Sequence, residues 1–383
     1  MTAHLDHSPR TGARGEDGDS LPRALTVLGI ETSCDETAAA VVRLDPGGGV
    51  KVLSSAVRTQ GEDHAPFGGV VPEIAARAHV ETIEILAAQA LDEAGVTRAA
   101  LDGVAATAGP GLVGGVMVGL AFAKAAALAL GKPLVAVNHL EGHAVSARLA
   151  QDTPYPFLLL LVSGGHCQLL DVRGVGVRRR LGSTVDDAAG EAFDKIGVAL
   201  GLTYPAGPAL ERLAEGGDPR RFPLPVALKG RAGCDFSFSG LKTAAARLAQ
   251  SLHTDDDRRD LAAAVQAAIA DQLVTRTARA MALFAKDHGP GDRRFVVAGG
   301  VAANTHLRTR LMDLCQNEGF SFAAPPLAFC TDNAAMIALA GAERLALGLS
   351  DGLDAPARPR WPLDEAAAAA TPTHRPGRKG AKA

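Results

Sequence analysis

The feature that most constrains the fold is an order of apolar segments that occurs twice along the chain. In the first occurrence, strand-like segments at 24–32 and 38–44 are joined by a polar turn, and a third strand is predicted at 50–57. Apolar positions at helical spacing predict helices over 71–94 and 114–130. A strand separates these helices, and the strand PLVAVNH follows the second. Hairpin strands followed by strand and helix units indicate a mixed sheet covered by helices.

The same order begins again at FLLLLVSG, which is followed by the strand HCQLLDVRG. A helix-rich stretch then occupies about 186–288, and the chain returns to a strand at RFVVAGG. We therefore predict an α/β fold of two lobes, each with a mixed sheet flanked by helices, and a ligand cleft between them. The predicted divisions are a disordered leader, an N-terminal α/β lobe, a C-terminal α/β lobe that contains the helical insertion, and a mostly disordered basic tail: 1–24, 25–150, 151–350 and 351–383.

Composition restricts the setting in which the chain works. Its 383 residues include 39 basic and 42 acidic ones, so no overall positive field indicates nucleic-acid binding. The five cysteines form no CxxC pair, which argues against a disulfide framework and a zinc ribbon. The first twenty residues lack the apolar core of a signal peptide, and the apolar stretch 108–130 contains Lys124 and several glycines. We expect a cytoplasmic protein without a membrane segment.

The hexapeptide NHLEGH, residues 138–143, directly follows the strand PLVAV. If a helix begins here, His139 and His143 stand at i and i+4 on one face, where two imidazoles can share a divalent metal. Glu141 stands two residues after the first histidine, so the zinc-protease motif HExxH and its general base are absent. Two histidines at this spacing also occur by chance.

Asp332, in the segment FCTDNAAM, is a candidate third ligand. It stands at a predicted transition from loop to helix, where a carboxylate is also an ordinary N-cap. As a ligand, it would complete a two-histidine, one-carboxylate site suited to iron(II) or zinc.

Two glycine-containing loops follow predicted strands and are candidates for holding an anionic group. Residues 161–165, LVSGG, end an apolar strand, and adjacent glycines let backbone amides approach a ligand that a Cβ would block. The segment GGVAAN ends the strand RFVVA, and its Asn304 can donate and accept hydrogen bonds. Each motif alone is equally typical of an ordinary turn.

Polar residues are dense in GIETSCDET, the turn between the first two strands, which carries Asp35 and Glu36. Such a turn could orient phosphate and metal-bound water, although turns favour these residue types anyway. The helix-rich stretch contains Asp194, in the segment GEAFDKIG. In the same stretch, the segment TYPAGPALE predicts a tight turn at Gly207. A ribose or amino-acid ligand would suit these residues, and solvated helix charges are the alternative.

In this order, the motifs GIETSCDET, NHLEGH, LVSGGH, DFSFSGLKTA, GGVAAN and TDNAAM resemble those of the TsaD family of tRNA threonylcarbamoyladenosine enzymes, also called Gcp or YgjD. The resemblance extends from about Thr26 to Leu347. It implies the two-lobed fold shared by actin, sugar kinases and heat-shock chaperone ATPases. It also implies transfer of a threonylcarbamoyl group from threonylcarbamoyl-AMP to N6 of adenosine 37, in tRNAs that read codons beginning with A.

By this resemblance, His139, His143 and Asp332 match the metal ligands of the family, with iron(II) expected and zinc as the alternative. The matching contacts to substrate, including the adenylate nucleotide, are Leu161, Val162, Ser163, Gly164, Gly165, Asp194, Gly207, Glu211 and Asn304.

Asp35 and Glu36 are our catalytic candidates, because their place in the hairpin turn suits removal of a proton from N6. The chain departs from the family pattern at Cys167, where Thr is common, and at Ala206, where Gly is usual. Both residues neighbour expected contacts, so these departures put only the local loop geometry in doubt.

The resemblance also implies partners: tRNA, a TsaB-like paralogue that forms a heterodimer, and a small TsaE-like ATPase. A separate TsaC-type synthase would supply the adenylate. Two other functions stay open, namely a metal-dependent endopeptidase of the O-sialoglycoprotein type, a label this family once carried, and a nucleotide-dependent scaffold protein.

Overall fold

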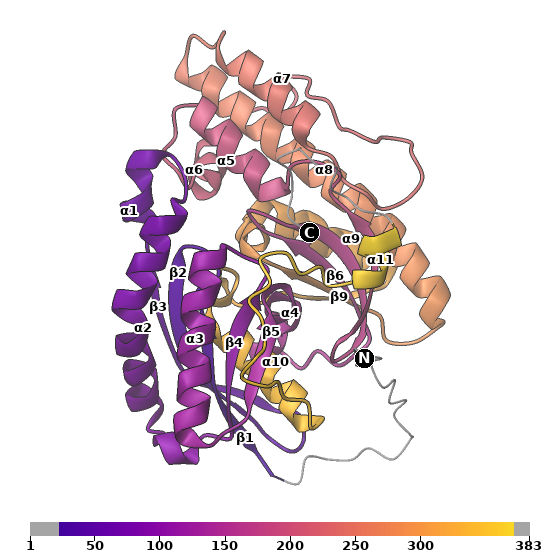
Figure 1. Cartoon of the computed structure of the whole chain (residues 1–383). Coiled ribbons are helices and arrows are strands. Elements are labelled where there is room, and N and C mark those ends of the chain that lie inside the picture. The colour runs from indigo at the N-terminus through magenta and orange to yellow at the C-terminus, as the bar shows by residue number, and fades with distance from the viewer. Residues whose placement is uncertain (1–22, 371–383) are drawn as a thin grey trace, which may run out of the picture.

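The computed structural model describes residues 23–370, which form two five-stranded sheets of the same topology (Figure 1). In each sheet, three antiparallel strands are followed by two parallel ones, in the orders β3-β2-β1-β4-β5 and β8-β7-β6-β9-β10. The strands are β1 (Leu25–Glu31), β2 (Glu36–Leu44), β3 (Val50–Thr59), β4 (Gly103–Gly109), β5 (Leu134–Asn138), β6 (Phe157–Val162), β7 (Cys167–Gly174), β8 (Val177–Ser183), β9 (Arg294–Ala298) and β10 (Ser321–Ala323). The doubled order of apolar segments thus corresponds to a doubled sheet.

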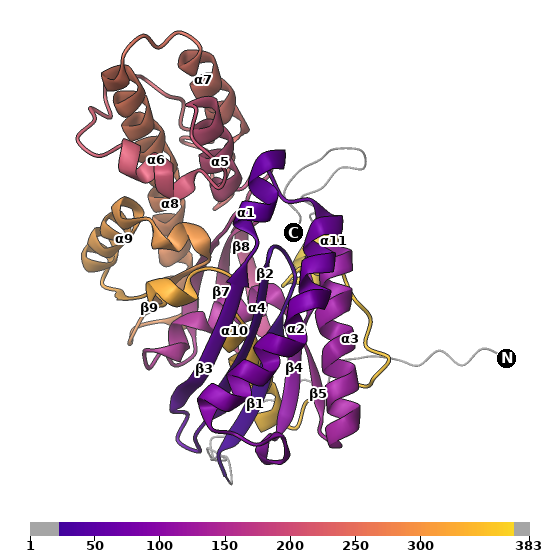
Figure 2. The ribbon, with the colours of Figure 1, turned by 90° about the vertical axis from the view of Figure 1, so that its left-hand side faces the viewer.

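Helices cover both faces of the first sheet. α2 (Pro72–Ala94) and α3 (Val113–Leu130) pack on one face, and α10 (Ala334–Ala346) packs on the other (Figures 1 and 2). Two short helices, α1 (Gly61–His64) and α4 (His139–Val145), follow strands β3 and β5. β4 is buried along its whole length, as expected for a parallel strand that lies between helical layers.

The second sheet carries the helix-rich part of the chain, whose upper part projects beyond the sheet in Figure 1. α8 begins with a capping box between Thr254 and Asp257, and its buried positions join those of β6 in one apolar core. The helices are α5 (Ala189–Ala199), α6 (Gly207–Leu213), α7 (Ser239–Ala249), α8 (Asp255–His288) and α9 (Thr305–Glu318). Short 3-10 turns lie at Ala65–Phe67, Arg98–Ala100, Ser146–Leu149, Gly300–Ala303 and Leu327–Phe329.

Among the described residues, α3 is the one helix that is long and apolar enough to cross a membrane. It packs with one face against α2 and the first sheet, and its bounds agree with the helix predicted over 114–130. Its other face exposes Val113, Met117 and Leu128, at 52%, 56% and 68% of their surface. The sequence signal for a membrane span therefore comes from a helix that is apolar on both faces.

The predicted divisions need correction at the C-terminal end. α10 was expected in the lobe 151–350, but it lies on the first sheet, where its small side chains pack against Val27 and Val42. The sequence order could not reveal this placement, because the contact joins segments about 300 residues apart.

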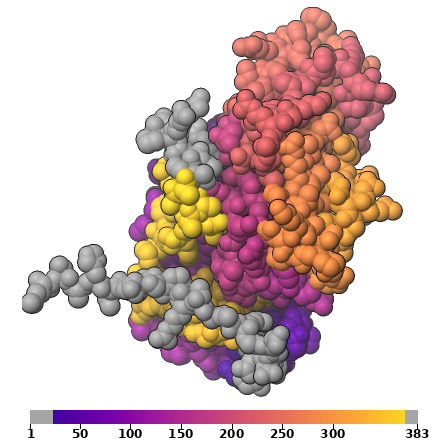
Figure 3. Space-filling model, turned by 90° about the vertical axis from the view of Figure 1, so that its right-hand side faces the viewer, coloured from indigo at the N-terminus to yellow at the C-terminus, as the bar shows by residue number. Residues whose placement is uncertain are grey.

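The prediction of a mostly disordered tail from residue 351 onward is also corrected for residues 351–370, which the structure describes. This segment follows the surface of both halves (Figure 3). The Arg358 amide donates to the Ala108 carbonyl at 2.7 Å, and the Asp364 carboxylate accepts from the Arg180 amide at 2.9 Å. Trp361 and Leu363 anchor the segment in the apolar cores, and it ends in α11 (Glu365–Ala370). The basic residues after 370 and the leader before residue 23 lie outside the described residues.

Candidate metal centre and substrate cleft

The three predicted metal ligands come together where two helices begin. His139 and His143 project from α4, and Asp332 stands just before α10. The Asp332 Oδ1 atom lies 3.0 Å from His143 Nε2 and 3.5 Å from His139 Nε2. One potential ligand atom from each residue lies within 4.8 Å of those of the other two. Two imidazole nitrogens and a carboxylate oxygen this close together fit a divalent transition metal.

Asp332 does not act as the N-cap of α10. That position belongs to Asn333, whose side-chain oxygen accepts from the Met336 amide at 3.0 Å. Because the neighbouring residue caps the helix, the Asp332 carboxylate is left for the two histidines, and the alternative interpretation of Asp332 is wrong. α4 is capped in the same way by Asn138, which accepts from the Leu140 amide.

A fourth residue, Glu31, fixes the orientation of His139. Glu31 is fully buried at the end of β1, and its Oε2 atom lies 3.0 Å from His139 Nδ1. The carboxylate also accepts from the Thr107 hydroxyl and, at 2.6 Å, from the Ser33 amide. A carboxylate at Nδ1 places a proton on that nitrogen and leaves the Nε2 lone pair for a metal.

Electrostatics at this centre favour a cation. Burial lowers the pKa of His139, but the carboxylates of Asp332 and Glu31 outweigh burial and raise it to about 9. For Asp332, burial raises the pKa, and the opposing effect of His139 and His143 holds it well below its usual range. His139 is therefore positively charged near neutral pH. A bound metal ion can replace this positive charge in the cluster.

The turn that carries Asp35 and Glu36 lies beside this centre. Burial, followed by the charges of Asp332 and Asp35, raises the pKa of Glu36 well above its usual value. A carboxyl group with a raised pKa in a cleft suits general acid-base work. The two catalytic candidates are therefore brought to the predicted metal ligands, although they are about 300 residues from Asp332 in the sequence.

The loop after β6 extends from an end of the second sheet. Gly164 and Gly165 are exposed, and the Ser163 hydroxyl accepts from the His166 amide at 3.1 Å. Gly190, at the start of α5, lies so close that a Cβ there would stand 2.6 Å from the Ser163 carbonyl oxygen. By contrast, the side chains of Leu161 and Val162 are fully buried in the apolar core, so only their backbone can meet a ligand.

Asp194 holds the turn that contains Gly207. Its Oδ1 atom accepts from the Ala206 amide at 2.8 Å and from the Gly207 amide at 3.0 Å. Burial raises the pKa of Asp194, and the charge of Asp35 on the first sheet adds to this effect.

Glu211 and Asn304 are joined at the start of α9. Glu211 accepts from the Thr305 amide at 2.7 Å and from the Thr305 hydroxyl. Asn304 caps the helix through the Leu307 amide and donates to Gln266 at 2.9 Å. Both residues use their polar groups within the protein, so they shape this side of the cleft.

Three residues at the cleft escaped the sequence prediction: Glu31, His166 and Tyr204. The charge of His166 lowers the pKa of Asp332, one of the candidate metal ligands. Burial raises the pKa of Tyr204, and the charges of Asp35 and Asp194 raise it further. All three stand in motifs that the sequence singled out, but only the fold reveals their common neighbourhood.

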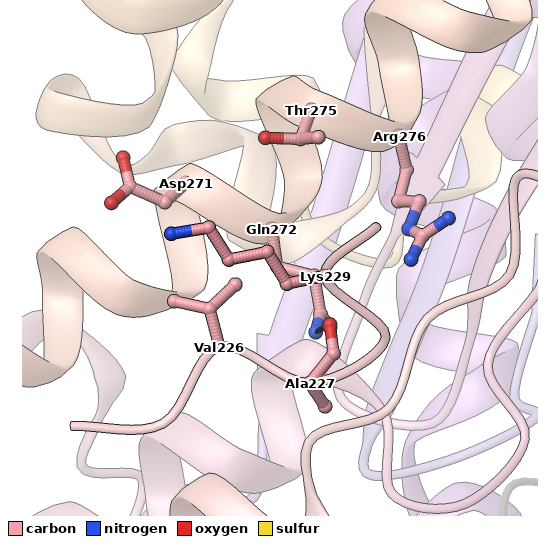
Figure 4. Close-up of a pocket in the computed structure, with 7 residues that line it drawn as sticks. All are labelled: Val226, Ala227, Lys229, Asp271, Gln272, Thr275 and Arg276. Atoms are coloured by element: carbon pink, nitrogen blue, oxygen red, sulfur yellow. Dashed lines mark hydrogen bonds between the residues drawn. The ribbon is translucent and has the colours of Figure 1, made fainter. Parts of the chain in front are cut away.

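A separate cavity of ≈ 180 Å³ lies against α8 (Figure 4). It is lined by Val226, Ala227, Lys229, Asp271, Gln272, Thr275 and Arg276. Gln272 donates to the Ala227 carbonyl, and Arg276 donates to the carbonyls of Arg231 and Gly233. These bonds fasten a loop to the helix, so the cavity is a gap beneath that loop.

Comparison with known proteins gives a consistent result. Residues 51–339 match the family described as TsaD, tRNA N6-adenosine threonylcarbamoyltransferase. A protein of that name from Caulobacter vibrioides is 73% identical over 94% of this chain and 98% of its own length. Another, from Maricaulis maris, is 61% identical over 94% of this chain and 97% of its own length.

Solved structures support the fold alone. Full-length HypF in its phosphate- and nucleotide-bound form gives a TM-score of 0.53 at 13% identity, over 88% of this chain and 48% of HypF. HypF from T. kodakarensis gives 0.54 at 15% identity, over 85% of this chain and 49% of that protein. This chain thus spans about half the length of HypF. Since HypF contains the actin-like fold, the predicted fold class is confirmed.

Proposed function

The chain belongs to the TsaD family of tRNA N6-adenosine threonylcarbamoyltransferases, and from this membership we propose how its cleft modifies tRNA. The enzyme transfers a threonylcarbamoyl group to N6 of an adenosine in tRNA. The donor is threonylcarbamoyl-AMP and the acceptor is adenosine 37 of tRNAs that read codons beginning with A. The observation that carries the proposal is the convergence of His139, His143 and Asp332 beside the turn of Asp35 and Glu36.

The chemistry requires orientation more than activation of a leaving group. The donor is a mixed anhydride, so AMP leaves readily with the electron pair of the broken C–O bond. N6 of adenine is a poor nucleophile because its lone pair is delocalised into the ring. As the N6–C bond forms, N6 loses a proton. Holding the reactants in line and accepting that proton are the tasks left to the protein.

His139, His143 and Asp332 would hold one divalent metal ion, iron(II) by preference and zinc as the alternative. When bound, the ion supplies Lewis-acid polarisation of a donor oxygen. Glu31 orients His139 through Nδ1, and this second contact supports a preformed site.

Glu36 is the preferred proton acceptor, with Asp35 beside it. The raised pKa of Glu36 supports this role, because a carboxylate of higher pKa is a stronger base. Exposed backbone at Gly164 and Gly165 is suited to the donor phosphate. Asp194 and the Gly207 turn would hold the ribose, while Glu211 and Asn304 keep that side of the cleft in place.

The endopeptidase alternative lacks a base in the helical motif that carries the two histidines. Glu141, the carboxylate of the NHLEGH motif, is buried and forms ion pairs with Arg178 at 3.1 Å and with Arg344 at 3.4 Å. A carboxylate held by two guanidinium groups is a poor candidate for activating water. A nucleotide-dependent scaffold remains the competing proposal, and it differs by requiring neither metal nor transfer.

A TsaB-like paralogue is the proposed partner of α3. The exposed face of this helix contains Val113, Met117 and Leu128 and has no charged side chain that is mostly exposed. A continuous apolar face of this kind is characteristic of a protein–protein interface. From the family resemblance alone we further propose a TsaE-like ATPase as a partner and, because tRNA is the acceptor, a cytoplasmic location.

The proposal is tested by incubating the protein and its partners with threonylcarbamoyl-AMP and an unmodified tRNA that reads codons beginning with A. Mass spectrometry of the nucleosides should reveal threonylcarbamoyladenosine at position 37 and none in a tRNA that lacks adenosine 37. Nucleotide binding without product under every combination of partners would instead support the scaffold.

A further inference from the structure

The turn that carries Asp35 and Glu36 is fastened to the helices behind it by its backbone. The Ser33 carbonyl accepts from the Leu112 amide at 2.8 Å, just before α3. The Asp35 carbonyl accepts from the Gln60 amide at 3.1 Å, just before α1. Both donors are backbone groups, so these two contacts depend on the fold and on no particular side chain.

The carbonyl between them is held differently. His79, fully buried on α2, lies with its Nε2 atom 3.2 Å from the Cys34 carbonyl oxygen. A carbonyl only accepts, so Nε2 carries the proton, and Nδ1 is left to accept from the Thr37 hydroxyl at 2.7 Å. His79 therefore contacts the turn on both sides of Asp35 and Glu36.

The surroundings of His79 keep it neutral and close to the turn. Burial lowers the pKa of His79 below its ordinary value, in agreement with an acceptor nitrogen at Nδ1. Gln60 also approaches Nδ1 through its side-chain amide, at 3.2 Å. On α3, a Cβ at Gly115 would stand 3.1 Å from the His79 Nε2 atom and 2.4 Å from the Thr32 carbonyl, so the absence of a side chain there permits this packing.

We propose that His79 is a positioning residue for the transfer reaction, which holds the Cys34–Glu36 turn so that its carboxylates face the acceptor amine. The inference rests on the proposed function and adds a residue that touches neither substrate nor metal. Because small displacements of a reacting group cost large factors in rate, the effect is expected in kcat.

The test compares His79→Leu with His79→Gln in the assembled enzyme. Leucine removes both hydrogen bonds, and we expect kcat to fall at least about tenfold while KM for donor and tRNA stays within about twofold. Glutamine can donate to Cys34 and accept from Thr37, so it should restore most of kcat. Metal content should stay at the wild-type value in both variants.

Ser54→Ala is the matched control. The Ser54 hydroxyl is also buried and also binds a backbone carbonyl of α2, that of Ala90 at 2.6 Å. Ala90 lies about 16 Å further along the helix than His79. This variant should lose thermal stability as His79→Leu does but keep wild-type kcat. If His79→Leu fails to fold, Thr37→Val, which removes the partner of Nδ1, should lower kcat with metal retained.

Three results would overturn the proposal: equal kcat in His79→Leu and Ser54→Ala, no recovery with glutamine, or loss of metal in proportion to loss of rate. If His79→Leu does not fold, a wild-type kcat in Thr37→Val would overturn the proposal. A wild-type enzyme without product would overturn the proposed function itself, and this role with it.

Discussion

At the scale of single residues, we predict that the candidate metal centre depends on Glu31 as well as on the three candidate ligands. Glu31→Gln preserves the shape of the side chain but removes the charge that holds a proton on His139 Nδ1. We predict metal affinity about 10- to 100-fold below wild type, measured by competition with a chromophoric chelator. Glu211→Gln, which changes a carboxylate that binds the Thr305 amide at the start of α9, should leave affinity unchanged. Equal affinities in all three proteins would remove Glu31 from the centre.

We predict that ionised Glu36 lowers the stability of the fold at neutral pH. Its pKa is raised by burial and by the charges of Asp332 and Asp35, so the native state favours the protonated form. The stability that this preference contributes is present at low pH and is lost as pH rises through the raised pKa. In metal-free protein, Glu36→Gln should therefore raise the Tm at pH 8 and make no difference near pH 4. A variant with lower Tm at both values would contradict this sign.

The residues of the centre differ in how far the sequence could predict them. His139 and His143 were found from their spacing, because a helix brings i and i+4 together. The sequence allows two roles for Asp332, a metal ligand and an N-cap, and only the motifs taken together favour the ligand. Glu31 lies in a motif that the sequence singles out, but its contact with His139 was not predictable, since it arises only through the parallel order of the sheet.

At the scale of elements, the C-terminal segment 351–370 joins the two halves. The Trp361 carbonyl accepts from the side-chain amide of Asn138, the residue that caps α4, the helix that carries the two candidate histidine ligands. We predict that Trp361→Ala lowers the free energy of unfolding by about 2 kcal/mol, since its ring is half-buried in the apolar core. Leu353→Ala, whose side chain is 46% exposed, should change it by less than about 0.5 kcal/mol. Denaturant titration measures both, and equal effects would show that the segment has no anchor at Trp361.

Helices and strands were predictable wherever periodicity is local. The helix predicted over 71–94 is α2 (Pro72–Ala94), and that over 114–130 is α3 (Val113–Leu130). The placement of α10 and of the segment after 350 was not predictable, because both depend on contacts with strands far away in the sequence.

At the scale of the whole molecule, two copies of one topology face each other across the candidate site. The doubled order of segments predicted this architecture, but not the strand order within each sheet. The first half supplies Glu31, His139 and the Glu36 turn, and the second supplies Asp194 and the glycine loop. Asp332 follows the second sheet in sequence and returns to the first with α10.

One measurement tests the central claim most directly: transfer by wild type and by His139→Ala, with metal analysis of the same preparations. Wild type should contain about one divalent metal ion per chain and form threonylcarbamoyladenosine at position 37. His139→Ala should lose the metal and the transfer activity together, while keeping its fold by circular dichroism. Full transfer by a variant that has lost its metal would contradict the account and leave the histidines a structural role.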